Sequence, residues 1–365
     1  MSRRPDRRSV LGGLAAAALA PTGHAKADIA SLIGQVLMVG FQGAEPDHFE
    51  TRSMLDHAAA GRIGGVLLLN RNIVSGPQIR RLTSAIAEAG APHPVLVAAD
   101  QEGGAIQRLG AGAGFTQLPS ARQTGQGGVA RARAIFRRMA GELSWAGVNM
   151  NLGPVVDLAR DGGAGVIGRL GRAYSANPQT VSALAAAFVG AHRDSGVLTV
   201  PKHFPGHGNT TQDSHQTLPD ISATWQPDEL APYRQLIDNP GIPAIMTAHL
   251  VHPRFSDEGH MPASLSARTT QALRQGLGFG GVIVTDDLQM NAIRLTTGSD
   301  EDAAIRALRA GADLLIFSGH PSFDPGLVNR LHAAIARAVE DGQLSRQMLQ
   351  AAARRIIAMK SRLFG

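Results

Sequence analysis

The chain has 365 residues, of which 44% are hydrophobic, 18% charged and 4% aromatic, a composition that excludes a disordered chain and allows a large core. The complete lack of cysteine excludes a disulfide framework, a thiolate metal site and a cysteine nucleophile. The first 27 residues account for most of the formal net charge of +6 and leave +2 for residues 28–365, so we expect no nucleic-acid partner.

Residues 1–27 have the pattern of a bacterial export signal. Arg7 and Arg8 precede the apolar stretch Val10–Ala20, and Ala25-Lys26-Ala27 matches an A-x-A cleavage site. The paired arginines followed by Ser-Val-Leu resemble a twin-arginine signal, which exports folded proteins. A disordered tail and an uncleaved amphipathic anchor are the alternatives. No apolar run reaches the roughly 20 residues that span a bilayer, so we expect no stable membrane insertion.

Eight short apolar runs follow, with helical stretches between them. Most runs are continuous and rich in branched residues, as in strands that are covered on both faces of a parallel sheet. The runs are Ile33–Phe41, Gly65–Leu69, Pro94–Asp100, Val148–Asp157, Leu198–Phe204, Ala244–Leu250, Gly281–Asp286 and Asp313–Ser318.

Helix signals lie between and after these runs. Ser299 is a candidate N-cap and Gly311 a candidate C-cap of one helix. Ser345 precedes a final helix with one apolar stripe, formed by Met348, Leu349, Ala352, Ile356, Met359 and Leu363. Eight β/α alternations in about 338 residues predict a single α/β domain, residues 28–365, folded as a (β/α)₈ TIM-type barrel. A doubly wound open sheet is the rival, but no G-x-G-x-x-G follows an early strand.

Titratable residues stand at the carboxyl ends of five predicted strands, where barrel enzymes carry their chemistry. Asp157 has an alternative interpretation as a turn cap, and His249 as a core histidine bonded to a backbone carbonyl. Taken together, the group favours an enzyme over a scaffold. Its members are Asp100, Asp157, Lys202, His203, His249, Asp286 and Asp287.

The segment Lys202–His215 combines histidines with Pro and Gly and predicts a strand end that runs into a long loop. A zinc site is one interpretation, but His207 and His215 lie eight residues apart and no H-E-x-x-H is present, so we expect no metal. The other interpretation is acid/base chemistry, with the carboxylate of Asp213 orienting the imidazole of His215 and raising its pKa.

This loop resembles the K-H-[FS]-P-G-H-G-x-T-x-x-D-S-H signature of the glycoside hydrolase family 3 β-N-acetylglucosaminidases, a family of β-hexosaminidases. The resemblance extends over about residues 30–320 and implies a single-domain form of the family, to which this chain adds the export signal that its first 27 residues predict. Further matching segments occur in the family's order: Asp100–Gly104 with Gln107–Leu109, Asn149–Asp157, Val282–Met290 and Ala310–Asp313.

The resemblance implies a role for each matching residue. Asp286 would be the nucleophile, His215 the general acid/base and Asp213 its partner. The residues implied to bind the terminal N-acetylglucosamine are Asp100, Arg108, Arg172, Lys202 and His203. No metal or organic cofactor is implied, and the partner is a small glycan ending in β-linked N-acetylglucosamine, such as a muropeptide or a chitooligosaccharide.

Three positions depart from the family pattern. Ala105 stands where the family has Arg, so any contact made there is lost. The family's I-G-x-R-S-F corresponds to Ile167–Tyr174 with two extra residues; we assign its arginine to Arg172, with Arg169 as the alternative. Asn209 occupies a position where Asp is common.

The implied reaction is retaining hydrolysis by double displacement. A phosphorylase on the same scaffold, a family 3 β-glucosidase and a catalytically silent cell-wall glycan-binding protein are alternatives. A β-glucosidase is disfavoured because such enzymes usually take their acid from a further domain. If His215 is not the acid/base, Glu102 is the carboxylate to test instead.

We predict that the mature protein begins at Asp28 and is periplasmic, because the arginine pair and the A-x-A site flank the apolar stretch. Mass spectrometry of the protein from its native cell checks the cleavage, and a chain that still begins near Met1 would contradict it. Replacing Arg7 and Arg8 by lysine should block export if the twin-arginine route is used.

Overall fold

The computed structural model describes residues 29–364, apart from residues 161–164, 211, 213, 215–216, 239–240, 258–259 and 320–322. The predicted signal at residues 1–27 and two predicted catalytic residues, Asp213 and His215, lie outside the described residues. Within the described part of the chain, no helix is long and apolar enough to cross a membrane.

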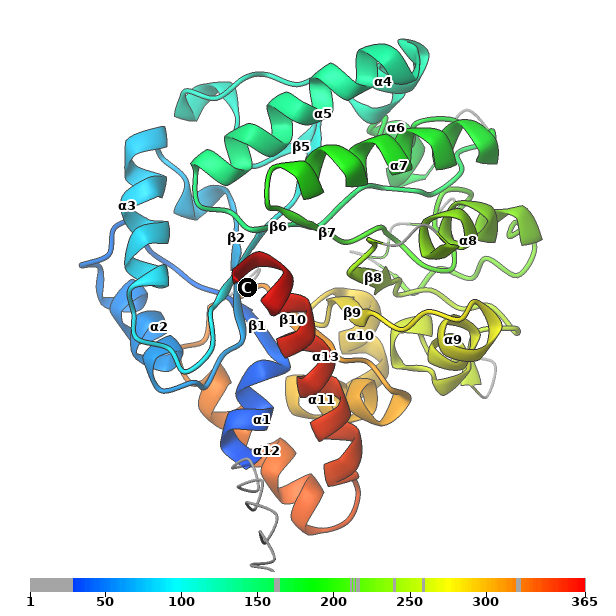
Figure 1. The fold of residues 1–365 in the computed structure, drawn as a ribbon. Coiled ribbons are helices and arrows are strands. Elements are labelled where there is room, and N and C mark those ends of the chain that lie inside the picture. Colours follow the sequence, from blue (N-terminus) through cyan, green and yellow to red (C-terminus); the bar gives the residue numbers. More distant parts are fainter. Residues whose placement is uncertain are drawn as a thin grey trace, which may run out of the picture.

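Eight parallel strands form one barrel-like sheet, in the order β7-β6-β3-β2-β1-β10-β9-β8 (Figure 1). Each of the eight predicted apolar runs contributes one strand. The strands are β1 (Leu37–Gly40), β2 (Gly65–Leu68), β3 (Leu96–Ala99), β6 (Met150–Asn151), β7 (Leu198–Thr199), β8 (Ala244–Thr247), β9 (Val282–Asp287) and β10 (Leu314–Phe317).

The chain just beyond β7 closes the seam between the two ends of this sheet. Phe204 forms a parallel bridge with Thr247. The Phe204 N–H donates to the carbonyl of Met246 at 2.8 Å, and the Ala248 N–H donates to the carbonyl of Phe204 at 2.8 Å. These bonds confirm the predicted barrel and exclude the open doubly wound sheet.

Helices surround the strands on the outside of the barrel (Figure 1). The α-helices are α1 (Ile29–Gln35), α2 (Phe49–Ala59), α3 (Gly76–Ala87), α4 (Ala121–Gln126), α5 (Gly128–Trp145), α6 (Val166–Arg169), α7 (Pro178–Asp194), α8 (Ala231–Asp238), α9 (Ala267–Gln271), α10 (Asn291–Thr297), α11 (Asp300–Ala310), α12 (Leu327–Glu340) and α13 (Arg346–Phe364). Short helical turns are η1 (Asn70–Asn72), η2 (Ala111–Ala113), η3 (Pro227–Leu230), η5 (Ala263–Leu265) and η6 (Ala272–Gly276).

Two of the predicted runs are only partly strand. The first run, Ile33–Phe41, begins inside α1, and its strand starts at Leu37, because Ile29–Gln35 form a helix that packs against α12 and α13. In the run Val148–Asp157 regular pairing stops at Asn151. Pro154, which has no N–H to donate, follows, and pairing resumes as a bridge between Val155 and Lys202.

The predicted helix signals hold with one exception. The hydroxyl of Ser299 accepts the Asp302 N–H at the start of α11, and Gly311 ends this helix with φ of 95°. Helix α13 begins directly after Ser345. Its predicted apolar stripe faces the core except at Met348, which is 39% exposed.

A hairpin that the sequence analysis did not anticipate follows β3. Strands β4 (Gln101–Gly103) and β5 (Ile106–Gln107) pair antiparallel through a tight turn. Gly103 and Gly104 have φ of 92° and 61°, and a Cβ at Gly103 would lie 2.4 Å from the carbonyl oxygen of Pro119. Only glycine fits this turn without strain. The hairpin extends β3 and brings the chain back toward the barrel mouth.

The opposite end of the molecule contains a buried lysine. Lys360 of α13 is 2% exposed, and its ammonium group donates to the side-chain oxygen of Gln35 at 2.8 Å. Burial lowers the pKa of Lys360 to about 7, because the charged form loses its hydration and gains only an uncharged amide.

We predict that the free energy of unfolding rises between pH 7.5 and 9.5 by about 2–3 kcal/mol more in the wild-type protein than in Lys360→Met. Over this range the unfolded chain holds the lysine proton that the folded chain has released, so a higher pH favours folding. Urea unfolding of both proteins at several pH values measures the difference. Parallel pH curves would contradict the prediction.

Candidate active site

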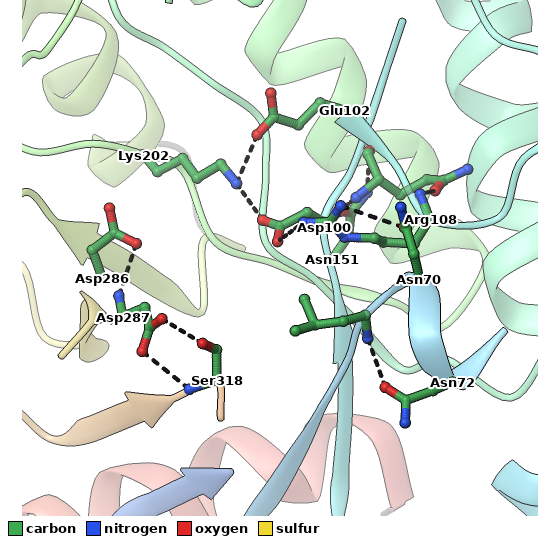
Figure 2. Close-up of polar contacts among 12 residues, drawn as sticks. Asn70, Asn72, Asp100, Glu102, Arg108, Asn151, Lys202, Asp286, Asp287 and Ser318 are labelled. Atoms are coloured by element: carbon green, nitrogen blue, oxygen red, sulfur yellow. Dashed lines mark hydrogen bonds and ion pairs between the residues drawn. The ribbon is translucent and has the colours of Figure 1, made fainter. Parts of the chain in front are cut away.

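A buried ammonium group lies at the carboxyl ends of the barrel strands. Lys202, which follows β7, is 2% exposed and donates to Asp100 at 2.6 Å and to Glu102 at 2.8 Å (Figure 2). Asp100 directly follows β3, and Glu102 lies on the hairpin that comes next. Although burial disfavours its charge, the two carboxylates raise the pKa of Lys202 above its usual value.

Two arginines complete this cluster. Arg172 holds Glu102 through two parallel bonds, Nε to Oε2 and an Nη to Oε1, both of 2.8 Å. Arg108 donates to Asp100 at 3.3 Å, while its Nε is buried and has no hydrogen-bond partner among the residues that the structure describes. A buried N–H of this kind is costly unless a ligand satisfies it.

The cluster carries one excess positive charge, because three cations face two carboxylates. Burial opposes ionisation of Asp100 and Glu102, but Lys202 and the arginines hold the pKa values of both carboxyls well below their usual range. Glu102 is therefore ionised over the whole functional pH range. A carboxylate in this state is a poor general acid.

His203 is held in one orientation by a carboxylate that is completely buried. Asp157 accepts the backbone N–H of His203 at 3.1 Å and that of His207 at 2.9 Å, and its other oxygen lies 2.7 Å from Nδ1 of His203. Asp157 thus acts as the turn cap that the sequence allowed, and it also leaves Nε2 of His203 directed toward Arg172, 3.4 Å away.

The two adjacent carboxylates at the end of β9 have different environments. Asp287 accepts the hydroxyl of Ser318 at 2.5 Å and its N–H at 3.0 Å, and burial raises the pKa of Asp287 to about 6. Burial also opposes the ionisation of Asp286, but the neighbouring His249, His203 and Lys202 and the N–H of Asp287 hold the pKa of Asp286 below its usual value. Of the two carboxylates, Asp286 is therefore the one whose anion is favoured.

His249 is a satisfied core histidine, as one of its two sequence interpretations stated. Its Nδ1 lies 2.6 Å from the hydroxyl of Ser264, and its Nε2 lies 2.8 Å from the backbone carbonyl of Asp287. The ring therefore helps to hold the end of β9 in place and lowers the pKa of the neighbouring Asp286.

Two cavities meet at Asp286. The larger, of about 500 Å³, has a floor of apolar side chains that include Leu67, Met246 and Ile316. The smaller, of about 110 Å³, is lined mainly by polar groups. Both cavities are bordered by Asp100, Arg108 and Asp286, while Arg172, Lys202, His203, His207 and Ser214 border the smaller one alone.

The structure brings together six of the eight predicted site residues: Asp100, Arg108, Arg172, Lys202, His203 and Asp286. Arg172 borders the smaller cavity, whereas its alternative Arg169 is exposed on α6. The sequence analysis did not assign Glu102 and Asp157 to these supporting roles, since their partners lie 70 and 46 residues away. Among the described residues no group of three or more His, Asp or Glu side chains is arranged to hold a metal ion.

Enzymes with a (β/α)₈ barrel have their active site at the carboxyl ends of the strands. In this protein that end of the barrel has a cavity bordered by carboxylates and cations. The polar border of the smaller cavity suits a ligand rich in hydroxyl groups, because charged donors and acceptors converge there.

Comparison with known proteins defines the class further. The chain matches the glycosyl hydrolase family 3 N-terminal domain over residues 29–359. It is 37% identical over 312 residues to a beta-hexosaminidase of Alkalilimnicola ehrlichii, an alignment that covers 81% of this chain and 84% of that protein. The chain therefore belongs to glycosyl hydrolase family 3 and is a glycoside hydrolase, as the sequence predicted.

Solved structures agree with this assignment. A beta-N-acetylhexosaminidase of Beutenbergia cavernae superposes with a TM-score of 0.80 at 32% identity, covering 92% of this chain and 98% of that one. A family 3 beta-N-acetylglucosaminidase of Paenibacillus sp. str. FPU-7 gives a TM-score of 0.82 at 31% identity, but this chain spans only 63% of its length.

Proposed function

We propose that the protein is a retaining exo-β-N-acetylglucosaminidase that removes terminal, β-linked N-acetylglucosamine from the non-reducing end of small glycans. The observation that carries the proposal is the position of Asp286, an ionised carboxylate at the junction of a polar cavity and a larger one. The names of the relatives in Alkalilimnicola, Beutenbergia and Paenibacillus support the choice of sugar.

In this proposal the terminal sugar occupies the smaller cavity and the rest of the glycan the larger one. Lys202, Arg108 and Arg172 donate to ring hydroxyls, and Asp100 accepts from them. His203 presents Nε2 because Asp157 holds Nδ1. The buried Nε of Arg108 then gains the partner that it lacks among the described residues.

The reaction proceeds in two displacements. The carboxylate of Asp286 attacks the anomeric carbon while His215 gives a proton to the glycosidic oxygen, and the aglycone leaves. Water, deprotonated by His215, then attacks the anomeric carbon of the covalent glycosyl-enzyme and releases Asp286. Asp213 stabilises the protonated imidazole in both steps. His249, His203 and Lys202 keep Asp286 ionised.

We further propose that the enzyme works in the periplasm, after export through the signal at residues 1–27. A relative in Arthroderma benhamiae that is 32% identical over 349 residues bears the name of a secreted glycosyl hydrolase. In that compartment the substrates available to the enzyme would be fragments of the cell wall.

The first prediction from the proposed function concerns the substrate. We expect kcat/KM for an aryl β-N-acetylglucosaminide to exceed that for the aryl β-glucoside at least 10-fold, because a site that hydrogen-bonds the acetamido group leaves its own polar groups unpaired when that group is missing. Equal rates would contradict the proposal. Assays with and without phosphate complete the test: a hydrolase releases the free sugar in both, and a phosphate-dependent sugar 1-phosphate would identify a phosphorylase.

The second prediction concerns the division of labour. Asp286→Asn should lose kcat by several orders of magnitude for every leaving group, because neither displacement can proceed without the nucleophile. The neighbouring variant Asp287→Asn removes a carboxylate of the same strand and should still turn over aryl substrates.

His215→Ala should lose 10²- to 10⁴-fold on a disaccharide, but much less in kcat/KM on an activated aryl glycoside, which leaves without a proton. A burst of phenol and acceleration by azide should accompany the loss, because azide replaces water without needing a base. A loss of the same size for both leaving groups, without burst or azide effect, would remove His215 from the acid/base role.

A further inference from the structure

A buried imidazole lies beside the site without a part in the proposed reaction. His207 is 2% exposed and borders the smaller cavity. Burial lowers the pKa of His207 to about 4, so the ring is neutral at working pH. Its Nδ1 is buried without a partner in the described part of the chain, and its Nε2 lies 3.2 Å from the hydroxyl of Ser214. Among the described residues, Ser214 is thus the hydrogen-bond partner of the His207 ring.

Ser214 is the residue between Asp213 and His215, the predicted acid/base pair. It is 3% exposed, so its hydroxyl is not shared with bulk solvent. Its carbonyl accepts the N–H of Ala292 at 3.4 Å. Ala292 belongs to α10, the helix that follows the nucleophile strand β9. Ser214 is therefore held at two points. Its hydroxyl contacts His207, and its carbonyl accepts an N–H from α10.

The backbone at and after His207 is anchored to the rest of the barrel. Its backbone N–H donates to the completely buried Asp157. Two residues further on, the side chain of Asn209 accepts the N–H of Arg160 at 3.0 Å and donates to the buried Glu229. Gly208 packs closely on the backbone of Leu158. A Cβ at Gly208 would lie 2.1 Å from the carbonyl oxygen of Leu158. These contacts of residues 207–209 leave His207 little freedom to move together with Ser214.

We propose that His207 is a positioning residue, which acts through the hydroxyl of Ser214 on the two residues that flank Ser214 in the sequence, Asp213 and His215. Consecutive Cα atoms lie 3.8 Å apart, so a restraint on Ser214 restrains both neighbours. Misplacement of a reacting group by about 1 Å is enough to reduce a rate roughly 10²-fold. The proposal rests on the proposed function, which gives His215 the acid/base role.

Ser214→Ala tests the proposal, because it removes one hydroxyl and leaves the backbone bond to Ala292. We expect kcat/KM on a β-linked disaccharide to fall about 10- to 100-fold, and kcat/KM on an activated aryl glycoside to fall less than about 3-fold. Azide should accelerate aryl turnover by the variant. Inhibition by free N-acetylglucosamine should be unchanged, because the sugar-binding groups are untouched.

Two further variants serve as controls. Ser214→Thr keeps a hydroxyl at the same place and should recover most of the lost rate. Ser222→Ala removes a hydroxyl from an exposed residue further along the same connection and should behave as the wild type. Thermal unfolding of each variant checks that its fold is intact.

A double-variant cycle ties the effect to His207. If the contact is what matters, His207→Leu and the double variant with Ser214→Ala should show the same leaving-group dependence, because either change removes the same hydrogen bond. Losses that multiply in the double variant would contradict the proposal.

His215→Ala, assayed in parallel, separates failure of this proposal from failure of the proposed function. If His215→Ala shows leaving-group dependence and azide acceleration but Ser214→Ala matches the wild type, the positioning role is wrong and the function stands. A uniform loss in Ser214→Ala with weaker sugar inhibition also overturns it, since that result marks a general structural role. If His215→Ala shows neither signature, the acid/base assignment fails and the positioning role fails with it.

Discussion

The ammonium group of Lys202, buried at the mouth of the barrel, is the constraint on which the site depends. A lysine removed from water needs compensating charge, and breaking such a pair leaves an uncompensated buried charge that costs several kcal/mol. Asp100 and Glu102 supply the compensation. Because these carboxylates lie on β3 and on the hairpin beyond it, the pairing fixes the hairpin against β7. Arg108 and Arg172 then take their positions around the same two carboxylates.

The groups around the site determine how its two adjacent carboxylates ionise. His249, His203 and Lys202 favour the anion of Asp286, whereas burial raises the pKa of Asp287, the next residue in the sequence, despite its bonds to Ser318. Two identical side chains thus differ in ionisation because cationic side chains outweigh burial at Asp286, while burial dominates at Asp287. Asp157 has a comparable effect on His203, since it fixes which ring nitrogen is directed toward the site.

The loop that follows β7 connects this cluster to the proposed proton transfer. Its first residues are anchored below the site by Asp157 and Glu229. Ser214 borders the smaller cavity and contacts both His207 and α10. In the proposed mechanism the nucleophile is carried by a strand of the barrel and the acid/base group by a loop. The contact between His207 and Ser214 is the one that we propose positions this part of the loop.

The sequence by itself determined the barrel and the positions where its polar groups would meet. Buried parallel strands must be continuous apolar runs, and their carboxyl ends must lie on one face. The tertiary structure alone decided which charges pair. Arg172 rather than Arg169 borders the cavity, Glu102 balances Lys202, and Ile29–Gln35 form a helix in place of part of the first strand. These outcomes depend on the closure of the barrel, which brings together residues that are far apart in the sequence, such as Asp100 and Lys202 at 102 positions, and local sequence patterns carry no information about such pairs.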